Sequence, residues 1–355
     1  MKIKGKRILY LCGELSLIGG IEKYNTDFIA AINLTGARVK VVERKTGGIA
    51  SKVSFIIRAL FSMLTFLPNH IICAHLHFSP IAFAAFKFFK VNFSLALYGI
   101  EAITINNSIY RLAVNNAKKI IVISEYTKYL VNSQFKLSDD KFFMLISSVD
   151  SKSNMFLENP LDLKKKYGFK DDLIILTISR QSSIEEKGQH RVIKAYLEVL
   201  KKFPNSKYIM AGPGSDIRVK EILNDNPTIQ NNVLNLGLIN DTEKNELYNL
   251  CDVFVLPSKN EGFGIVFIEA LVCGAKVIAS NGFGCFDGLL NGRLGVVVNP
   301  DDSKELEDAI SNTLQNAPMW TIEDRRRIRE QTLEVYGYES WCEKVENFIV
   351  QIGKH

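Results

Sequence analysis

The sequence lacks the features that mark several simple classes of protein. Its six cysteines are scattered, and no two form a Cys-x-x-Cys pair. We therefore expect buried thiols in a reducing compartment rather than a disulfide framework. No apolar run reaches the roughly 18 uninterrupted residues of a spanning helix, and the short run after Arg7 is too brief for a signal peptide. With 355 residues, 47% hydrophobic and 23% charged, the chain predicts a globular protein of two domains.

Acidic residues are scarce in the first half of the chain. Residues 1–155 hold 20 Lys and Arg against 9 Asp and Glu, a net charge of +11, whereas the rest holds 24 against 29, a net charge of −5. These values sum to the formal net charge of +6. A basic first half predicts an anionic partner, and nucleic acid, an anionic membrane face and a phosphorylated lipid all fit.

Short apolar runs alternate with longer amphipathic segments along the whole chain, as is typical of a parallel sheet with crossover helices. The expected strands are Arg7–Cys12, Arg38–Val42, His70–Ala74, Ser94–Tyr98 and Lys119–Ile123, then Leu173–Ile178, Lys207–Ala211, Val233–Leu236, Val253–Leu256 and Lys276–Ala279. A helix is expected over Thr242–Leu250, with Thr242 as its cap.

The fold class that follows is α/β, with two doubly wound Rossmann-like domains. A cluster of Asn, Ser and Pro over residues 151–163 marks the boundary between them. We expect a first domain over 1–157 and a second over 158–338. Residues 339–355 are expected to form a C-terminal helix that packs back on the first domain.

Two apolar stretches resemble membrane segments without meeting their length. Val53–Leu67 is interrupted by Arg58, and Ile71–Phe86 contains two histidines and a proline. We favour the buried core of a parallel-sheet domain for both. The alternative is an interfacial face, for which the mixed aromatic and cationic run Phe86–Phe93 is suited.

The strongest motif is the run Pro257–Ala270, which follows an expected strand and opens a helix. Its glycines at the turn let a ligand approach the backbone, and the first amides of a helix bind anions such as phosphate. Glu261 and Glu269 flank this turn eight residues apart, so that one carboxylate could bind a sugar and the other a ribose. A helix with a chance second glutamate is the weaker interpretation.

Two further groups are weaker when each is taken alone. Arg180 directly follows a strand and Lys187 precedes a helix, which suits a diphosphate, but ordinary surface cations would explain them better. Gly19 and Gly20 follow the first strand, where they either cradle a phosphate or form a tight turn.

Together these stretches resemble the family-4 retaining glycosyltransferases of the GT-B fold. The Glu-x7-Glu motif (Glu261, Glu269) is specific, and the order of Arg180, Lys187 and the later glycine turns matches the family over most of the chain. The resemblance implies that Arg180, Lys187 and Glu261 serve catalysis. It implies donor binding by Gly19, Gly20, Gly212, Leu238, Ile239, Asn240, Gly262, Phe263, Gly264, Ile265 and Glu269.

The chain departs from the family at two places. Relatives carry His-Gly where this sequence has Tyr98-Gly99, so Tyr98, His77 and Glu101 are carried over only as donor-sugar or acceptor contacts. The family's Gly-Gly-x-Pro-Glu loop is here residues 281–287, where Asp287 stands in place of the glutamate. This variant most resembles bacterial surface-polysaccharide members.

We expect no metal site. His75 and His77 lie at strand spacing but lack a third ligand nearby, and the chain contains no Asp-x-Asp that would hold a metal-bridged diphosphate. No cofactor is expected beyond the nucleotide sugar as co-substrate.

The resemblance implies a retaining, metal-independent hexosyltransferase. It also implies that the two domains face a central cleft, with the acceptor bound by the first domain and the nucleotide sugar by the second. The donor would be a UDP- or GDP-linked sugar, and the acceptor a hydroxyl of a glycan or a polyprenyl-diphosphate-linked molecule in cell-surface polysaccharide synthesis. The alternatives are a non-catalytic nucleotide-sugar sensor or scaffold and a GT-B sugar-nucleotide epimerase. We expect a cytoplasmic protein, peripheral on the inner face of the plasma membrane through its basic first domain, with no nucleic-acid partner.

Overall fold

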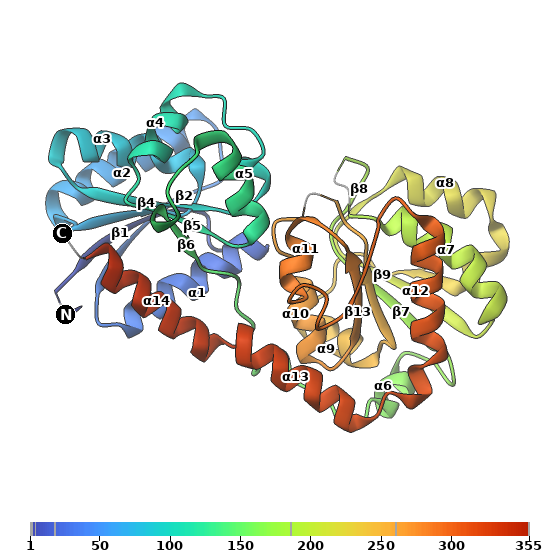
Figure 1. The fold of residues 1–355 in the computed structure, drawn as a ribbon. Helices are drawn as coiled ribbons and strands as arrows, with labels where there is room; N and C mark the ends of the chain where they lie inside the picture. The colour runs from blue at the N-terminus through green and yellow to red at the C-terminus, as the bar shows by residue number, and fades with distance from the viewer. Residues whose placement is uncertain (1–2, 4, 18, 185–186, 260, 354–355) are drawn as a thin grey trace. The chain divides into compact units, whose positions relative to one another are not determined.

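The protein is described by a computed structural model over residues 3, 5–17, 19–184, 187–259 and 261–353. Contacts divide the chain into two compact units, residues 1–148 with 339–355 and residues 149–338. The predicted boundary at 157 lies further along the chain than the first of these divisions. Figure 1 shows a parallel sheet covered by helices in each unit.

The first unit is built on a six-stranded parallel sheet of order β2-β1-β3-β4-β5-β6. Its strands are β1 (Arg7–Gly13), β2 (Arg38–Arg44), β3 (His70–Cys73), β4 (Asn92–Leu97), β5 (Lys119–Val122) and β6 (Phe142–Met144). Its helices are α1 (Gly20–Leu34), α2 (Ile49–Phe66), α3 (Ser79–Phe89), α4 (Ser108–Asn116), α5 (Glu125–Phe135) and, from the end of the chain, α14 (Tyr338–Ile352). The sheet is buried on both faces, which explains its runs of Ile, Val and Leu.

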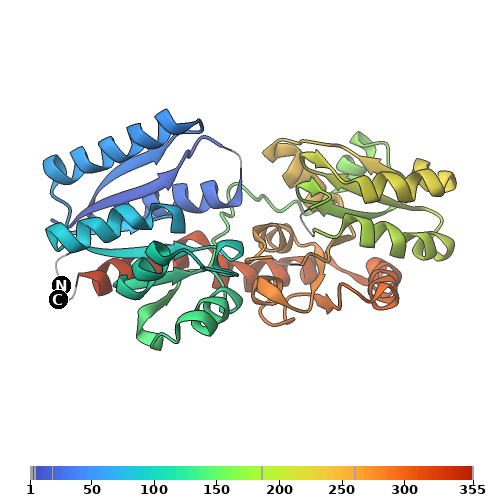
Figure 2. The same ribbon diagram turned by 90° about the horizontal axis from the view of Figure 1, so that it is seen from above.

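Helices α2 to α5 cover one face of this sheet, and α1 with α14 cover the other (Figures 1 and 2). Phe28 of α1 meets the rings of Tyr10, Trp341 and Phe348 at centroid distances of 5.8 to 5.9 Å. The Trp341 indole also donates to the carbonyl of Ile146 at 2.5 Å. The last helix is therefore part of the first unit's aromatic core.

The second unit has a six-stranded parallel sheet of order β11-β9-β7-β12-β13-β14 and a small pair, β8 with β10. Its strands are β7 (Leu173–Ile178), β8 (Gln181–Ser182), β9 (Ser206–Ala211), β10 (Gly214–Ser215), β11 (Val233–Asn235), β12 (Val253–Leu256), β13 (Lys276–Ser280) and β14 (Val296–Val298). Its helices are α6 (Leu161–Lys166), α7 (Gln189–Lys202), α8 (Ile217–Asp225), α9 (Asp241–Leu250), α10 (Ile265–Val272), α11 (Phe283–Gly288), α12 (Ser303–Gln315) and α13 (Ile322–Tyr336).

The structure corrects two local expectations. Helix α9 is capped by Asn240 rather than Thr242, because the Asn240 side chain accepts from the Glu243 amide and the Glu243 carboxylate accepts from the Asn240 amide. Helix α2, which covers most of Val53–Leu67, is not a buried core helix. Its inner face packs on the sheet, but most of its remaining apolar side chains are exposed.

The cysteines have the environment that the sequence predicts for five of the six positions. All six are free thiols, five of them buried and Cys342 half-buried. Burial raises the pKa of the Cys12 thiol to about 12. These side chains therefore act as small apolar groups at neutral pH.

Candidate active site

The predicted donor-site residues of the second unit gather at one edge of its sheet. Parallel strands end at the same edge, and Arg180, Gly212, Leu238 and Glu261 follow β7, β9, β11 and β12. The strand order reverses between the neighbours β7 and β12. Open α/β sheets bind ligands at such a switch point, because the flanking loops diverge there and leave a crevice.

An ion pair bridges the two central loops of this edge. Lys187 Nζ, after β7, lies 2.9 Å from Glu261 Oε2, after β12. Both side chains are mostly buried, and Ser258 Oγ lies 3.5 Å from the same carboxylate oxygen. The structure thus joins two predicted catalytic residues that are 74 positions apart in the sequence.

Glycines allow the loops to approach one another closely. Gly188 has a φ of 95°, and a Cβ there would lie 2.5 Å from the carbonyl oxygen of Pro257. Gly212, with a φ of 126°, packs equally tightly on the backbone at Ser179. No other residue fits these positions without moving the strand ends.

The start of α10 presents backbone amides to the same edge. Gly264 caps the helix with a φ of 83°, and Phe263 is buried beneath the turn. The carbonyl of Glu261 accepts from the amide of Gly284 at 2.8 Å, which ties this turn to the start of α11. Asn260 of the motif lies outside the described residues. This arrangement suits an anion, since the first amides of a helix have no partner within it.

Glu269 lies one turn into α10 and is 4% exposed. Lys244 Nζ lies 3.0 Å from its Oε1, and the Tyr248 hydroxyl donates to its Oε2 at 3.0 Å. Burial lowers the pKa of Lys244, but Glu269 and Asp241 together outweigh this effect and the net pKa is raised. Burial raises the pKa of Tyr248 well above its ordinary value. The Glu269 side chain is therefore held in position by two groups from α9.

The remaining donor-site predictions of the second unit lie on the same edge but are more exposed. Arg180 is exposed, and its carbonyl accepts from Gln189 Nε2 at 3.1 Å. Leu238 is exposed, Ile239 is half-buried, and Asn240 caps α9. An exposed apolar side chain next to a polar edge suits the face of a nucleotide base.

Five predicted residues lie in the first unit, at the carboxyl edge of its own sheet. Gly19 and Gly20 follow β1, His77 follows β3, and Tyr98 and Glu101 follow β4. These three strands are neighbours in the sheet. The structure therefore places the predicted site residues on two sheet edges, one in each unit.

The Tyr98 hydroxyl points into the first unit. It donates to Asn25 Oδ1 at 2.9 Å, and the Tyr10 hydroxyl donates to the same oxygen at 2.6 Å. The amide of Tyr98 donates to the Glu101 carboxylate at 2.5 Å. Burial raises the pKa of Glu101, against the lowering by backbone amides. The loop after β4 thus holds the Glu101 carboxyl group in place through the backbone amide of Tyr98.

His77 is exposed and lies beside His75, with ring centroids 4.5 Å apart. His75 Nδ1 accepts from the His77 amide at 3.1 Å. Burial lowers the pKa of His75 to about 4, so its ring is neutral at pH 7. Among the described residues, no three His, Cys, Asp or Glu side chains are grouped so that they could hold a metal ion.

Sequence reasoning missed the residues that position the predicted ones. Gln189 is buried and donates to Ser179 Oγ at 2.7 Å, which joins α7 to the end of β7. Lys244 and Tyr248 hold Glu269, and Asn25 holds Tyr98. Nothing in local spacing identifies these partners, because each contact joins different elements. The one available signal was a lysine and a tyrosine four residues apart, which share a helix face.

Comparison with known proteins finds similarity to glycosyltransferases. The family model described as "Glycosyl transferases group 1" matches residues 161–335. The alpha-monoglucosyldiacylglycerol synthase of Acholeplasma laidlawii is 26% identical over 256 residues, which is 66% of this chain and 62% of that protein. The capsular polysaccharide biosynthesis glycosyltransferase CapM of Staphylococcus aureus is 28% identical over 216 residues, 58% of this chain and 54% of that protein.

Among solved structures, HepE from Anabaena in complex with UDP and glucose aligns with a TM-score of 0.78 at 18% identity, covering 97% of this chain and 99% of that one. This likeness confirms the predicted α/β architecture with two Rossmann-like sheets, the GT-B fold. The sequence matches span less than two thirds of the length of either curated relative.

Proposed function

Because the chain belongs to the group 1 glycosyltransferases, the family-4 retaining enzymes of the GT-B fold, we propose that it moves a hexose from a UDP- or GDP-linked sugar to an acceptor hydroxyl. The acceptor is a glycan or a polyprenyl-diphosphate-linked molecule in cell-surface polysaccharide synthesis. The observation that carries this proposal is the Lys187–Glu261 pair at the switch point, beside the start of α10. Cations, a carboxylate and free amides meet there, as a sugar diphosphate requires.

In this proposal the donor competes for groups that are already paired. The Lys187 ammonium lies 2.9 Å from Glu261, and a diphosphate carries more charge than one carboxylate. Transfer of Lys187 to the diphosphate releases Glu261 to accept hydrogen bonds from sugar hydroxyls. Arg180 and the amides at Gly262–Gly264 stabilise the negative charge that grows on the leaving diphosphate, with no divalent ion required.

Glu269 accepts hydrogen bonds from the ribose hydroxyls, and the base lies against Leu238–Asn240. Gly212 of the second unit allows close approach of the donor at this edge, and Gly19 and Gly20 have the same proposed role in the first unit. The acceptor hydroxyl attacks from the face of the leaving group, and a phosphate oxygen takes its proton, so the anomeric configuration is retained. His77 and Glu101 are the acceptor contacts of the proposal, together with the backbone at Tyr98.

The proposed location is the cytoplasm, peripheral on the inner face of the plasma membrane. The basic first half supports this location, because anionic lipid attracts it. A relative named as a diacylglycerol glycolipid synthase supports a lipid-linked acceptor.

A second candidate function is a non-catalytic nucleotide-sugar sensor. The observation that favours it is Tyr98, whose hydroxyl donates to Asn25 and stands where relatives carry a histidine. A sensor would bind the donor without transferring or hydrolysing its sugar.

The test is a thermal-shift and turnover screen with UDP-, GDP- and dTDP-sugars, paired with soluble and polyprenyl-linked acceptors. A true donor raises the melting temperature, because it binds only the folded state. Arg180→Ala is expected to lower turnover roughly a hundredfold. Arg293→Ala is the matched control, because Arg293 is exposed and precedes β14 at the opposite edge of the same sheet.

Three outcomes contradict the proposal or part of it. If no nucleotide sugar raises the melting temperature, the proposed donor site is wrong. Tight donor binding without transfer in any pairing favours the sensor. Turnover of Arg180→Ala within about twofold of wild type removes the assigned role of that side chain.

A further inference from the structure

Helix α2 carries apolar side chains on its outer face as well as its inner one. We call the exposed set the outer stripe; it consists of Val53, Ile56, Ile57, Leu60, Phe61 and Leu64. Their spacings of three, four and one follow the 3.6-residue period, so they share one side of the helix. Phe61 and Leu64 are 64% and 65% exposed. A continuous exposed stripe of six apolar side chains is typical of an interaction surface.

The inner face of α2 is fixed in the core. Phe55, Ala59 and Met63 are buried among the residues that cover the sheet, and the Phe55 ring lies 5.1 Å from that of Phe78. By length and composition α2 could cross a membrane, and 22% of this 18-residue helix is buried inside the protein. Crossing would remove these three side chains from the core. The helix is therefore suited to lie flat on an apolar surface, with its outer stripe facing away from the sheet.

The segment of sequence that contains α2 carries charges of only one sign. No Asp or Glu occurs between Glu43 and Glu101, a stretch that holds six Lys and Arg. When α2 is projected along its axis, Arg58 falls next to Phe61 at one border of the outer stripe, whereas Lys52 is an exposed residue of the first turn. An apolar stripe that is bordered by a cation, on a helix without carboxylates, is complementary to a surface with an apolar interior and anionic groups at its edge.

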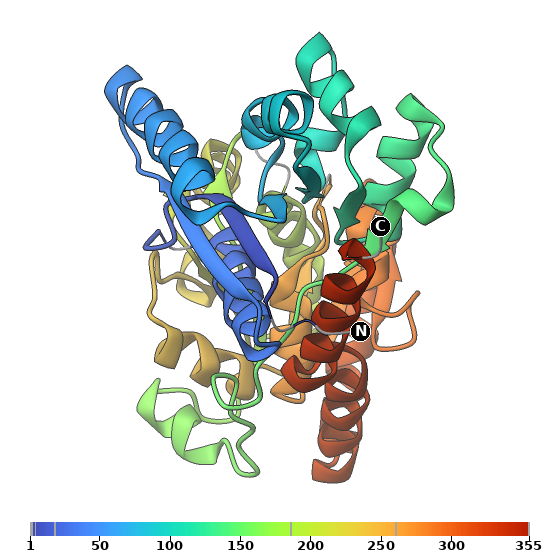
Figure 3. The ribbon, with the colours of Figure 1, turned by 90° about the vertical axis from the view of Figure 1, so that its left-hand side faces the viewer.

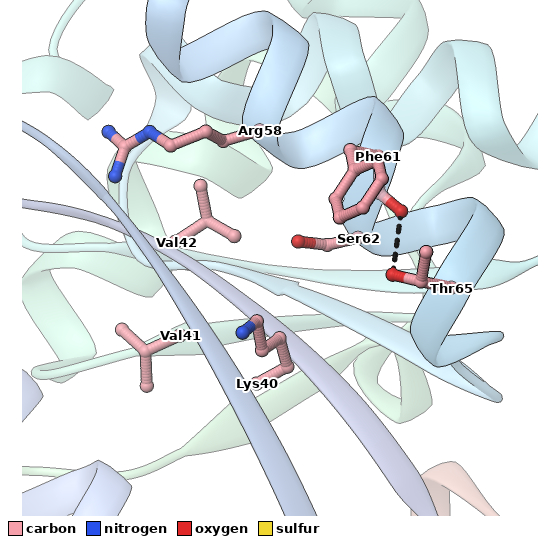
Figure 4. Close-up of a pocket in the computed structure, with 7 residues that line it drawn as sticks. All are labelled: Lys40, Val41, Val42, Arg58, Phe61, Ser62 and Thr65. Carbon is pink, nitrogen blue, oxygen red and sulfur yellow. Dashed lines mark hydrogen bonds between the residues drawn. The ribbon is translucent and has the colours of Figure 1, made fainter.

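A groove beside the outer stripe adds a place for an anionic group. It measures about 260 Å3 and lies between the edge strand β2 and α2, where Lys40, Arg58, Phe61 and Ser62 line it. Figure 4 shows Lys40 of β2 on one side of the groove and Phe61 and Ser62 of α2 on the other. Arg58 Nη2 donates to the Glu43 carbonyl at 2.6 Å, which leaves further N–H groups of its guanidinium for a ligand.

We propose that α2 docks the first unit on an anionic phospholipid bilayer. The outer stripe enters the boundary between headgroups and acyl chains, and a lipid phosphate lies between Lys40 and Arg58. A second copy of the chain fits this surface less well, because a symmetric contact between two outer stripes would bring the two Arg58 side chains, which lie near the middle of α2, close together.

The end of α3 extends the same surface. Phe88 and Phe89 are 81% and 56% exposed, and Lys87 and Lys90 lie next to them in the sequence. Helices α2 and α3 lie on the same face of the sheet (Figure 3) and both run antiparallel to its strands. Their C-terminal ends therefore lie at the same edge, where aromatic rings and lysines are suited to the headgroup region.

The test is co-sedimentation of the full chain with vesicles. We expect recovery with vesicles of equal parts phosphatidylcholine and phosphatidylglycerol, less recovery at high salt, and little with phosphatidylcholine alone. The double variant Ile57→Asp/Leu60→Asp is expected to weaken partitioning at least tenfold. Leu34→Asp is the matched control, because Leu34 is an even more exposed leucine, on α1, which covers the other face of the sheet.

Two further measurements keep the outcome decisive. In Phe61→Trp, a lipid with brominated acyl chains is expected to quench the new tryptophan. Lys40→Glu/Lys52→Glu is expected to remove the preference for phosphatidylglycerol. Donor-induced thermal shifts of all these variants should match wild type, which separates loss of docking from loss of the proposed donor site.

The proposal is overturned if wild type stays in solution with anionic vesicles, or if Ile57→Asp/Leu60→Asp pellets as wild type does. It is also overturned if sedimentation equilibrium shows a dimer that this double variant dissociates, since the outer stripe would then bind a second copy.

Discussion

At the scale of single residues, Glu269 has to be held before it can bind anything. A carboxylate that is 4% exposed is costly unless its charge is compensated, and Lys244 and Tyr248 provide that compensation. Both partners come from α9, which begins directly after the predicted base-binding segment at Leu238–Asn240. The side chain proposed to bind ribose and the loop proposed to bind the base are thus positioned by one helix.

We predict that Glu269→Gln lowers the affinity for the nucleotide donor about tenfold, because an amide accepts fewer hydrogen bonds from two hydroxyls and leaves Lys244 with Asp241 as its remaining carboxylate partner. Calorimetric titration with the donor measures the effect. Glu307→Gln is the control, since Glu307 is likewise a buried carboxylate, on α12, and it pairs with Lys202 of α7 and Lys304 of α12. Both variants should lose about 1–3 kcal/mol of unfolding free energy. Equal donor affinity in the two would contradict the ribose assignment.

At the scale of elements, most strands were predictable and two short edge strands were not. Strands β7 and β12 have the predicted bounds, because they are apolar runs closed by polar residues. Strands β6 and β14 were missed, since three residues carry no period, whereas the equally short β11 was predicted as part of the longer run Val233–Leu236. The exposed outer stripe of α2 was also missed, because a helix with two apolar faces has the same pattern as a buried one. The ion pair between Lys187 and Glu261 required the strand order, which spacing does not contain.

The loop after β7 gives a prediction at this scale. Gly188→Ala should cost more than 2 kcal/mol of stability and weaken donor binding, because the new Cβ would lie 2.5 Å from the Pro257 carbonyl oxygen and push β7 and β12 apart. Gly168→Ala is the control. Its φ of 74° gives similar backbone strain, but nothing lies within 4 Å of its Cβ. Chemical denaturation and donor titration should show about 1 kcal/mol of destabilisation and unchanged donor affinity for the control. Equal costs would indicate that the loops adjust freely.

At the scale of the whole molecule, the first unit is completed by residues from the far end of the chain. Trp341 is fully buried and contacts Tyr24 and Phe28, at ring centroid distances of 5.7 and 5.9 Å. Residues 149–338, which form the second unit, lie between the two parts of the first in sequence. A substitution that destabilises α14 should therefore also destabilise the first unit's strands, such as β1 and β3.

We predict that Trp341→Ala destabilises the first unit by about 3–5 kcal/mol, because it removes a large ring from a closed aromatic cluster. Hydrogen exchange should quicken in the amides of β1 and β3 while those of β7 and β12 stay protected. Glu346→Ala, an exposed position on α14, should leave both sets unchanged. Faster exchange in β7 as well would mean that the two units do not unfold separately.

Because α14 belongs to the first unit but is synthesised last, the two units are expected to complete their folding at different times during synthesis. Trp341 lies 197 positions after the end of β6 at Met144 (341 − 144). At about 5–20 residues each second, the ribosome needs roughly ten seconds or more to make this stretch. Until then Tyr24 and Phe28 have no covering helix, whereas the second unit has every strand it needs. The nascent chain is therefore expected to finish its middle portion first and to depend on chaperones for its beginning.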